Sequence, residues 1–136
     1  MDVAKALAGG LSLSRVGFGL GYLLQPQQAR TSWIGRAARK PGTQVIVRSQ
    51  GVRDVVLGAG GLRALARGDA AELRVWVTGH AVCDLVDLLA TWAVRDELPK
   101  RRGRMAMGVA AASTLVGGAA AAGLSRRSPG APPPPR

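Results

Sequence analysis

The sequence is poor in cysteine and in aromatic residues, and both shortages narrow what the chain can be. Cys83 is the single cysteine, so no internal disulfide can form and no CxxC redox pair exists. Aromatic residues make up 4% of the chain, fewer than the core of a soluble domain usually contains. Nucleophile elbows, phosphate-binding loops and zinc knuckles are also missing, and no catalytic pairing is visible. The sequence therefore gives no indication of an enzymatic activity or a cofactor, and whether the chain is an enzyme stays open at this point.

Small apolar residues are abundant instead. Apolar residues make up 47% of the 136 residues, and the chain contains 19 glycines. Helix packing in lipid favours small residues, because they allow two backbones to approach closely. A chain of this length usually forms one domain. The composition thus favours one domain of membrane helices over a soluble globular domain.

Four segments have the length that a membrane span requires, which is about 20 mostly apolar residues. They cover residues 6–24, 45–65, 73–94 and 105–124. Proline or charged residues follow or precede each segment, as expected at helix ends. The sequence predicts an all-α, four-helix transmembrane bundle over residues 1–125. Residues 126–136 are basic and proline-rich, and we expect them to form a disordered tail.

Only the last of these segments, residues 105–124, contains no charged residue. Each ionisable residue in the middle of a span costs roughly 2.5–3.5 kcal/mol on insertion scales. At roughly 100° per residue, however, the polar residues of each helix gather on one side, as a charged bundle interior requires. Three arginines and three aspartates balance in sign, with one histidine beside them. The predicted buried network consists of Arg15, Arg48, Arg53, Asp54, His80, Asp84 and Asp87.

The pattern His80-x-x-x-Asp84-x-x-Asp87 places an imidazole and two carboxylates on one helix face. These groups could form salt bridges with the arginines and hold the bundle together. Alternatively they could relay protons, or bind a ligand or a divalent metal. The structural role is favoured, because three ligands from one helix are not specific for a metal site. Neighbouring Arg53 and Asp54 project in different directions, so each is expected to pair with another helix.

Glycines at helical spacing predict where helices touch. Gly17 and Gly21 are four residues apart in the first segment, which is the spacing of a common helix-contact signature. Gly51, Gly58 and Gly61 share one face of the second segment with Asp54. We expect all five glycines to pack against neighbouring helices.

The basic residues, which give the chain a net charge of +11, lie mainly between the apolar segments. The first and third loops, on the same side of a four-helix bundle, are the most basic. The positive-inside rule places them in the cytoplasm of a bacterial cell, with both termini outside the plasma membrane. Basic loops also favour contact with anionic lipid. The uncharged run 105–124 and the lack of a binding motif argue against nucleic acid as a partner.

Several motifs together resemble an uncharacterised family, a domain of unknown function, of small four-helix membrane proteins from actinobacteria and other bacteria. They are Arg15-x-Gly17, Trp33-Ile34-Gly35, Arg48-x-x-Gly51-x-Arg53-Asp54-x-x-x-Gly58 and Asp84-Leu85-x-Asp87. The chain is also loosely similar to the DoxX-like membrane proteins in size and helix count, but it lacks a redox cysteine pair. The resemblance implies a fold and a membrane location, and it draws attention to the Arg and Asp positions.

We therefore expect a small integral membrane protein that acts as a structural or interaction module. It would work as a homo-oligomer or with a membrane-protein partner, and the Arg/Asp network would hold its helices. The alternative is a small transporter or proton-relay protein that uses Asp54, His80, Asp84 and Asp87. Transport needs a hydrated path to both surfaces, whereas a structural network needs a dry, fully paired interior.

Overall fold

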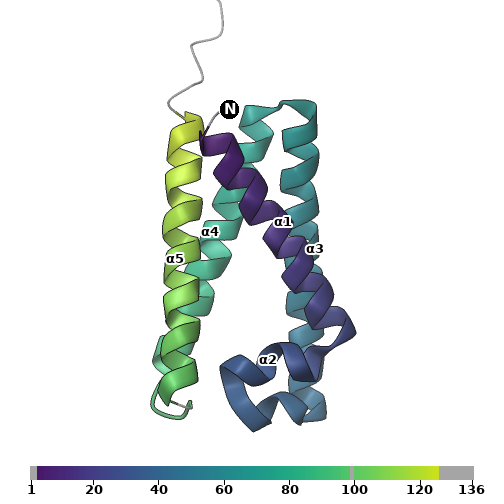
Figure 1. The fold of residues 1–136 in the computed structure, drawn as a ribbon, viewed down its shortest axis with the longest axis vertical. Helices are drawn as coiled ribbons and strands as arrows, with labels where there is room; N and C mark the ends of the chain where they lie inside the picture. Colours follow the sequence, from purple (N-terminus) through teal and green to yellow (C-terminus); the bar gives the residue numbers. More distant parts are fainter. Residues whose placement is uncertain (1–2, 99, 126–136) are drawn as a thin grey trace, which may run out of the picture.

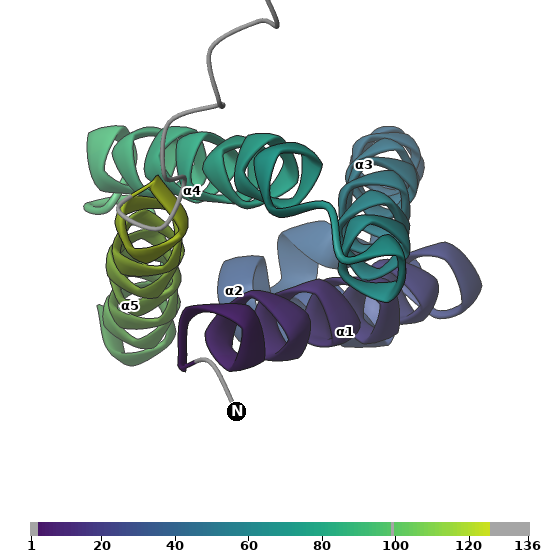
Figure 2. The ribbon, with the colours of Figure 1, turned by 90° about the horizontal axis from the view of Figure 1, so that it is seen from above.

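The computed structural model describes residues 3–98 and 100–125, and every regular element within them is helical. Four long helices pack as a bundle: α1 (Val3–Leu24), α3 (Pro41–Arg67), α4 (Ala70–Ala93) and α5 (Lys100–Ser125) (Figure 1). Seen from above, they occupy the four sides of the bundle in chain order (Figure 2). The prediction of an all-α four-helix bundle is confirmed. The tail expected over residues 126–136 lies outside the described residues.

Two short elements occupy the segment expected to be the first loop. Helix α2 (Pro26–Ile34) follows α1 almost directly, and the 3-10 helix η1 (Gly35–Arg39) continues to α3. Pro26 and Pro41 occupy the first positions of α2 and α3. Proline is tolerated there because a backbone N–H at the start of a helix has no partner within the helix. The second predicted segment therefore begins at Pro41 and not at residue 45. Helix α2 contacts α1, α3 and α5 at one end of the bundle (Figure 1).

The turn between α3 and α4 is short and well specified. Gly68 ends α3 with a φ of 70°, a left-handed conformation that glycine adopts without steric cost. Asp69 then caps α4, because its side chain accepts a hydrogen bond from the Glu72 backbone N–H at 2.9 Å. This turn lies at the same end of the bundle as Val3 and Ser125. We call it the turn end, and the end with α2, η1 and the α4–α5 connection the α2 end.

Helices α1 and α3 approach so closely that glycine is required between them. A Cβ atom on Gly19 would lie 2.7 Å from the Gly51 carbonyl oxygen, and one on Gly58 would lie 2.5 Å from the Ser12 carbonyl oxygen. Gly61 likewise faces the Ser12 side chain. Real Cβ atoms do not come this close to backbone, so these glycines determine how α1 and α3 cross.

The bundle interior is small and partly polar, while the large apolar side chains lie outside. The main apolar cluster lies near the turn end, where Ala8, Ala64, Leu73, Val77 and Ala120 are buried together. All four long helices carry large apolar residues on their exposed faces. Examples are Phe18 on α1, Val56 on α3, Val86 on α4 and Leu115 on α5. This distribution is the reverse of that in most soluble bundles.

Replacing Gly58 by alanine tests the close contact between α1 and α3. The new Cβ would meet the backbone of Ser12 and Val16, so the helices must move apart. We expect Gly58→Ala to destabilise the fold by about 1–3 kcal/mol, the usual cost of overpacking. Thermal unfolding followed by circular dichroism measures it. Gly10→Ala is the control, because no atom in the described part of the chain lies within 4 Å of a Cβ there. Equal stability of the two variants would contradict the close contact.

Candidate functional site

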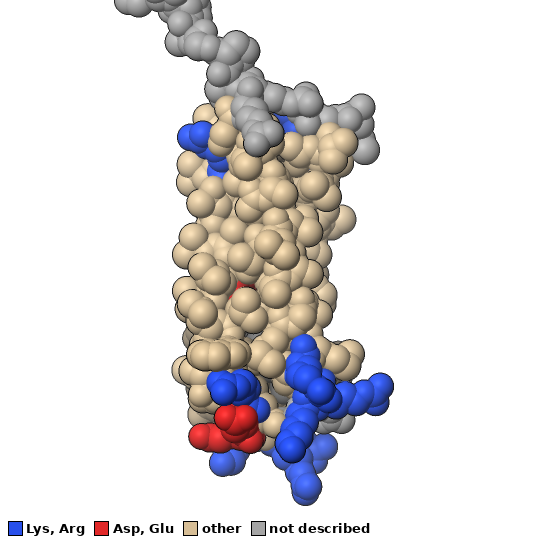
Figure 3. Space-filling model, turned by 90° about the vertical axis from the view of Figure 1, so that its left-hand side faces the viewer, with Lys and Arg blue, Asp and Glu red and all other residues tan. Residues whose placement is uncertain are grey.

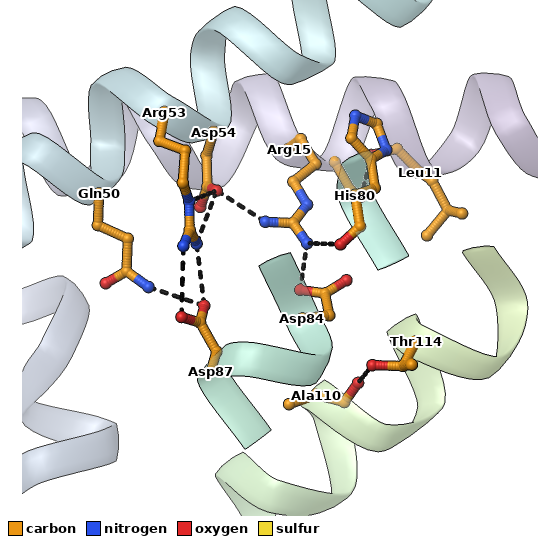
Figure 4. Close-up of polar contacts among 11 residues, drawn as sticks. Leu11, Arg15, Gln50, Arg53, Asp54, His80, Asp84, Asp87, Ala110 and Thr114 are labelled. Atoms are coloured by element: carbon orange, nitrogen blue, oxygen red, sulfur yellow. Dashed lines mark hydrogen bonds and ion pairs between the residues drawn. The ribbon is translucent and has the colours of Figure 1, made fainter. Parts of the chain in front are cut away.

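Arg15 projects from the middle of α1 into the bundle and joins two other helices. Its side chain is buried, and the residue is 8% exposed. Nη1 donates a hydrogen bond of 2.7 Å to Asp54 Oδ1 on α3, and Nη2 donates to Asp84 Oδ1 on α4 (Figure 4). Nη2 also lies 3.5 Å from the His80 carbonyl oxygen. One guanidinium thus connects α1, α3 and α4 in the bundle interior.

Arg53 makes a second, more exposed set of ion pairs nearby. Its Nη1 and Nη2 donate to the two oxygens of Asp87 at 3.3 and 2.9 Å, a bidentate arrangement (Figure 4). Gln50 adds a hydrogen bond of 2.9 Å to Asp87 Oδ2. Arg53 also donates to Asp54 Oδ1 at 3.2 and 3.3 Å. The expectation that Arg53 and Asp54 pair only with other helices is therefore wrong, because the long arginine side chain reaches back to its neighbour.

Arg48 is not part of this network. Its side chain is exposed near the α2 end, beside a small cavity that Leu24, Pro26 and Gln44 also line. The reason is helical geometry, since six residues separate Arg48 from Asp54, a rotation of roughly 240° about α3. The predicted balance of three arginines and three aspartates becomes two arginines, Arg15 and Arg53, with three aspartates.

His80 is buried but lies apart from the carboxylates. The residue is 1% exposed, and its ring lies near Gly61 and the backbone of Leu57. Neither ring nitrogen has a hydrogen-bond partner of normal geometry within the described part of the chain. No group of three His, Cys, Asp or Glu among the described residues could hold a metal ion. The metal interpretation of the His80, Asp84 and Asp87 pattern thus lacks geometric support.

A cleft of about 450 Å³ lies beside the network, between α1 and α5. The two helices are close near the turn end and diverge toward the α2 end (Figure 1). Apolar side chains form most of the walls, including Leu11 and Phe18 of α1 and Met105 and Val109 of α5. The charged part of the lining comes from the network, namely from Arg15, Asp54, Asp84 and Asp87.

Gly17 and Gly21 also line this cleft, which corrects their expected role as helix contacts. No atom of the described residues lies within 4 Å of a Cβ built at either position. Helix α1 packs on α3 through the face that carries Gly19, and the C-terminal half of α1 diverges from α5 (Figure 1). Gly51, Gly58 and Gly61 of α3, by contrast, lie at the contact with α1.

Two features of the site have no clear signal in the sequence. Gln50 was not among the expected network residues, although it lies one helical turn before Asp54 and shares the Asp87 carboxylate with Arg53. The cleft depends on the angle between α1 and α5, which no local pattern encodes. Comparison of the chain with protein-family models, curated proteins and solved structures finds no match. The resemblance to small bacterial four-helix membrane proteins therefore stays a prediction.

Removing the Arg15 charge tests whether the network holds the bundle. Arg15→Gln leaves Asp54 and Asp84 without their shared cation in the interior. Breaking one side of a buried ion pair costs about 3–5 kcal/mol, and we expect a loss of stability of that size. The matched control is Arg48→Gln, an exposed arginine on α3, for which we expect a change within about 0.5 kcal/mol. Similar unfolding midpoints for both variants would show that the network is dispensable.

Proposed function

We propose that the chain is a small integral membrane protein whose four long helices span the bilayer. In this proposal the Arg/Asp network specifies how the helices pack, and the protein serves as a structural or interaction module. The observation that carries the proposal is the distribution of side chains. Large apolar residues cover the outside of the bundle, whereas ion pairs and small residues fill its interior.

Few charged side chains are exposed in the middle of the bundle, a zone that we call the belt. Among the described residues, the charged side chains between the two ends of the bundle belong to the network: Arg15, Arg53, Asp54, Asp84 and Asp87. The other basic and acidic residues gather toward the ends, which leaves the middle of the viewed face almost uncharged (Figure 3). Such a belt suits hydrocarbon, where exposed charge is costly and large apolar side chains are not.

The individual helices differ in how well they suit a membrane. Among the described residues, Val3–Leu24 and Gly103–Ser125 are long and apolar enough to cross one. Helices α3 and α4, which carry the network aspartates, are not among these spans. In the folded bundle these carboxylates pair with Arg15 and Arg53, so α3 and α4 present apolar faces outward. Insertion of α3 and α4 therefore depends on the other helices.

The basic residues favour one orientation. The α2 end carries Arg36, Arg39, Lys40, Arg95, Lys100, Arg101 and Arg104. The turn end carries Lys5, Arg63, Arg67 and Arg74, of which Arg63 pairs with Glu72. By the positive-inside rule, the α2 end lies in the cytoplasm of a bacterial cell and contacts anionic lipid headgroups. Both termini then lie outside the plasma membrane.

A second candidate function is solute or proton transport, which the carboxylate-lined cleft favours. Transport requires a path to both surfaces, and the cleft provides only part of one. Toward the turn end, the lining of the cleft reaches only Leu11 on α1 and Ser113 on α5. Both residues are well short of Val3 and Ser125, which lie at that end. His80 is absent from the lining, although the transport hypothesis uses it. The structural module is thus the better supported proposal.

Site-directed labelling tests the membrane belt. In a Cys83→Ala background, we would place single cysteines at Leu115 and Val56 in the belt, and at Asp96 and Arg67 at the two ends. In sealed vesicles, a membrane-impermeant maleimide should label only one end, and both ends after permeabilisation. The belt positions, although exposed in the bundle, should stay unlabelled because lipid covers them. Labelling of the belt at the rate of the ends would contradict the proposal.

A further inference from the structure

We propose that the cleft between α1 and α5 is a binding site for an amphiphilic cation, a molecule with one ammonium group and an apolar body. The ammonium would pair with the Asp84 carboxylate, and the apolar body would lie between the two helices. This inference rests on the proposed membrane location, because it takes the ligand from the lipid phase.

The charges of the network are the first argument. Three carboxylates, those of Asp54, Asp84 and Asp87, share two guanidinium groups, those of Arg15 and Arg53. Counted with all three carboxylates ionised and His80 neutral, the network has a formal charge of −1. A buried charge is costly unless an opposite charge compensates it. A monovalent cation in the cleft would complete the network, whereas an anion would add to its negative charge.

Asp84 shows where the cation would sit. The residue is 7% exposed and belongs to the lining of the cleft. Its Oδ1 accepts from Arg15, while its Oδ2 is buried and has no hydrogen-bond partner within the described residues. Arg15 cannot serve both oxygens, because its Nη1 is directed to Asp54 (Figure 4). Asp84 Oδ2 is thus an unused acceptor for an ammonium N–H.

The apolar walls of the cleft indicate that the rest of the ligand is apolar. Leu11, Phe18, Met105 and Val109 surround the cleft with apolar surface, and its volume of about 450 Å³ is typical of small-molecule sites. The part of α5 that lines the cleft, from Met105 to Ser113, contains no charged residue. A hydrated inorganic cation would leave this apolar surface unused, whereas an alkyl or aryl chain would cover it.

Access is from the side of the bundle. Phe18, Met105 and Val109 line the cleft and are also among the exposed large apolar residues of the outer surface. A small patch of acidic atoms is visible in the middle of the viewed face, where the surrounding surface is uncharged (Figure 3). In the proposed orientation this opening lies within the bilayer, so an amphiphile could enter laterally from the hydrocarbon.

The test compares octylammonium with octanol, which has the same chain and no charge. Both would be titrated by calorimetry into the protein in lipid nanodiscs, with empty nanodiscs as the blank. We expect octylammonium to bind saturably to one site, at least about tenfold more tightly than octanol, as a charge-assisted hydrogen bond allows. Equal affinities would overturn the proposal and would identify the cleft as a groove for a neutral lipid chain.

Two variants and two controls locate the binding. Asp84→Asn should remove the preference for octylammonium, and Asp96→Asn, in an exposed loop, should retain it. Val109→Trp should fill the cleft and abolish binding, while Leu115→Trp, on the outer face of the same helix, should not. Val109 is 62% exposed and lies outside the network, so Val109→Trp should fold. This variant therefore tests binding in the cleft even if Asp84→Asn fails to fold.

Unchanged octylammonium binding to the Val109→Trp variant would place the ligand elsewhere and overturn the proposal. The outcome is separable from that of the labelling experiment. A protein whose belt is protected by lipid but that does not bind octylammonium would contradict only the ligand proposal. A belt that is freely labelled would contradict the membrane location.

Discussion

The guanidinium of Arg15 lies in the bundle interior, and its need for compensation constrains the rest of the structure. A buried cation is tolerated only when carboxylates approach it closely, so α3 and α4 must place Asp54 and Asp84 beside α1. The glycine contacts of α3 make this approach possible, because they bring the backbones of α1 and α3 together at Gly19 and Gly58. Close packing and charge pairing therefore depend on each other in this fold.

Helix α5 stands outside this constraint, and the cleft is the consequence. The network joins α1, α3 and α4 by ion pairs, whereas α5 packs on α4 through small residues such as Gly117 against Ala81. The Thr114 hydroxyl of α5 donates a hydrogen bond of 2.9 Å to the Ala110 carbonyl oxygen of its own helix. Among the described residues, no ion pair of the network reaches α5, which diverges from α1, and Asp84 lies in the lining of the cleft between them.

The sequence predicts the fold better than the site. The regular spacing of apolar and charged residues predicts four helices. It also predicts that five charged side chains point into the bundle, namely Arg15, Arg53, Asp54, Asp84 and Asp87. The same spacing does not predict α2 and η1, because the prolines and glycines in residues 25–42 indicate a loop. Arg48 was misplaced because charge balance favoured a third arginine, while the rotation of α3 directs it outward. Gly17 and Gly21 matched a contact signature, but the crossing angle of α1 leaves them without a neighbouring helix.

A double-mutant cycle between Arg15 and Asp54 tests the central claim most directly. The free energies of unfolding of Arg15→Gln, Asp54→Asn and the double variant would be measured with the parent protein under one set of detergent conditions. If the network holds the bundle, the double variant should be less destabilised than the sum of the single variants, by at least about 1 kcal/mol. Additive losses, within about 0.3–0.5 kcal/mol, would mean that Arg15 and Asp54 act independently and would contradict the account.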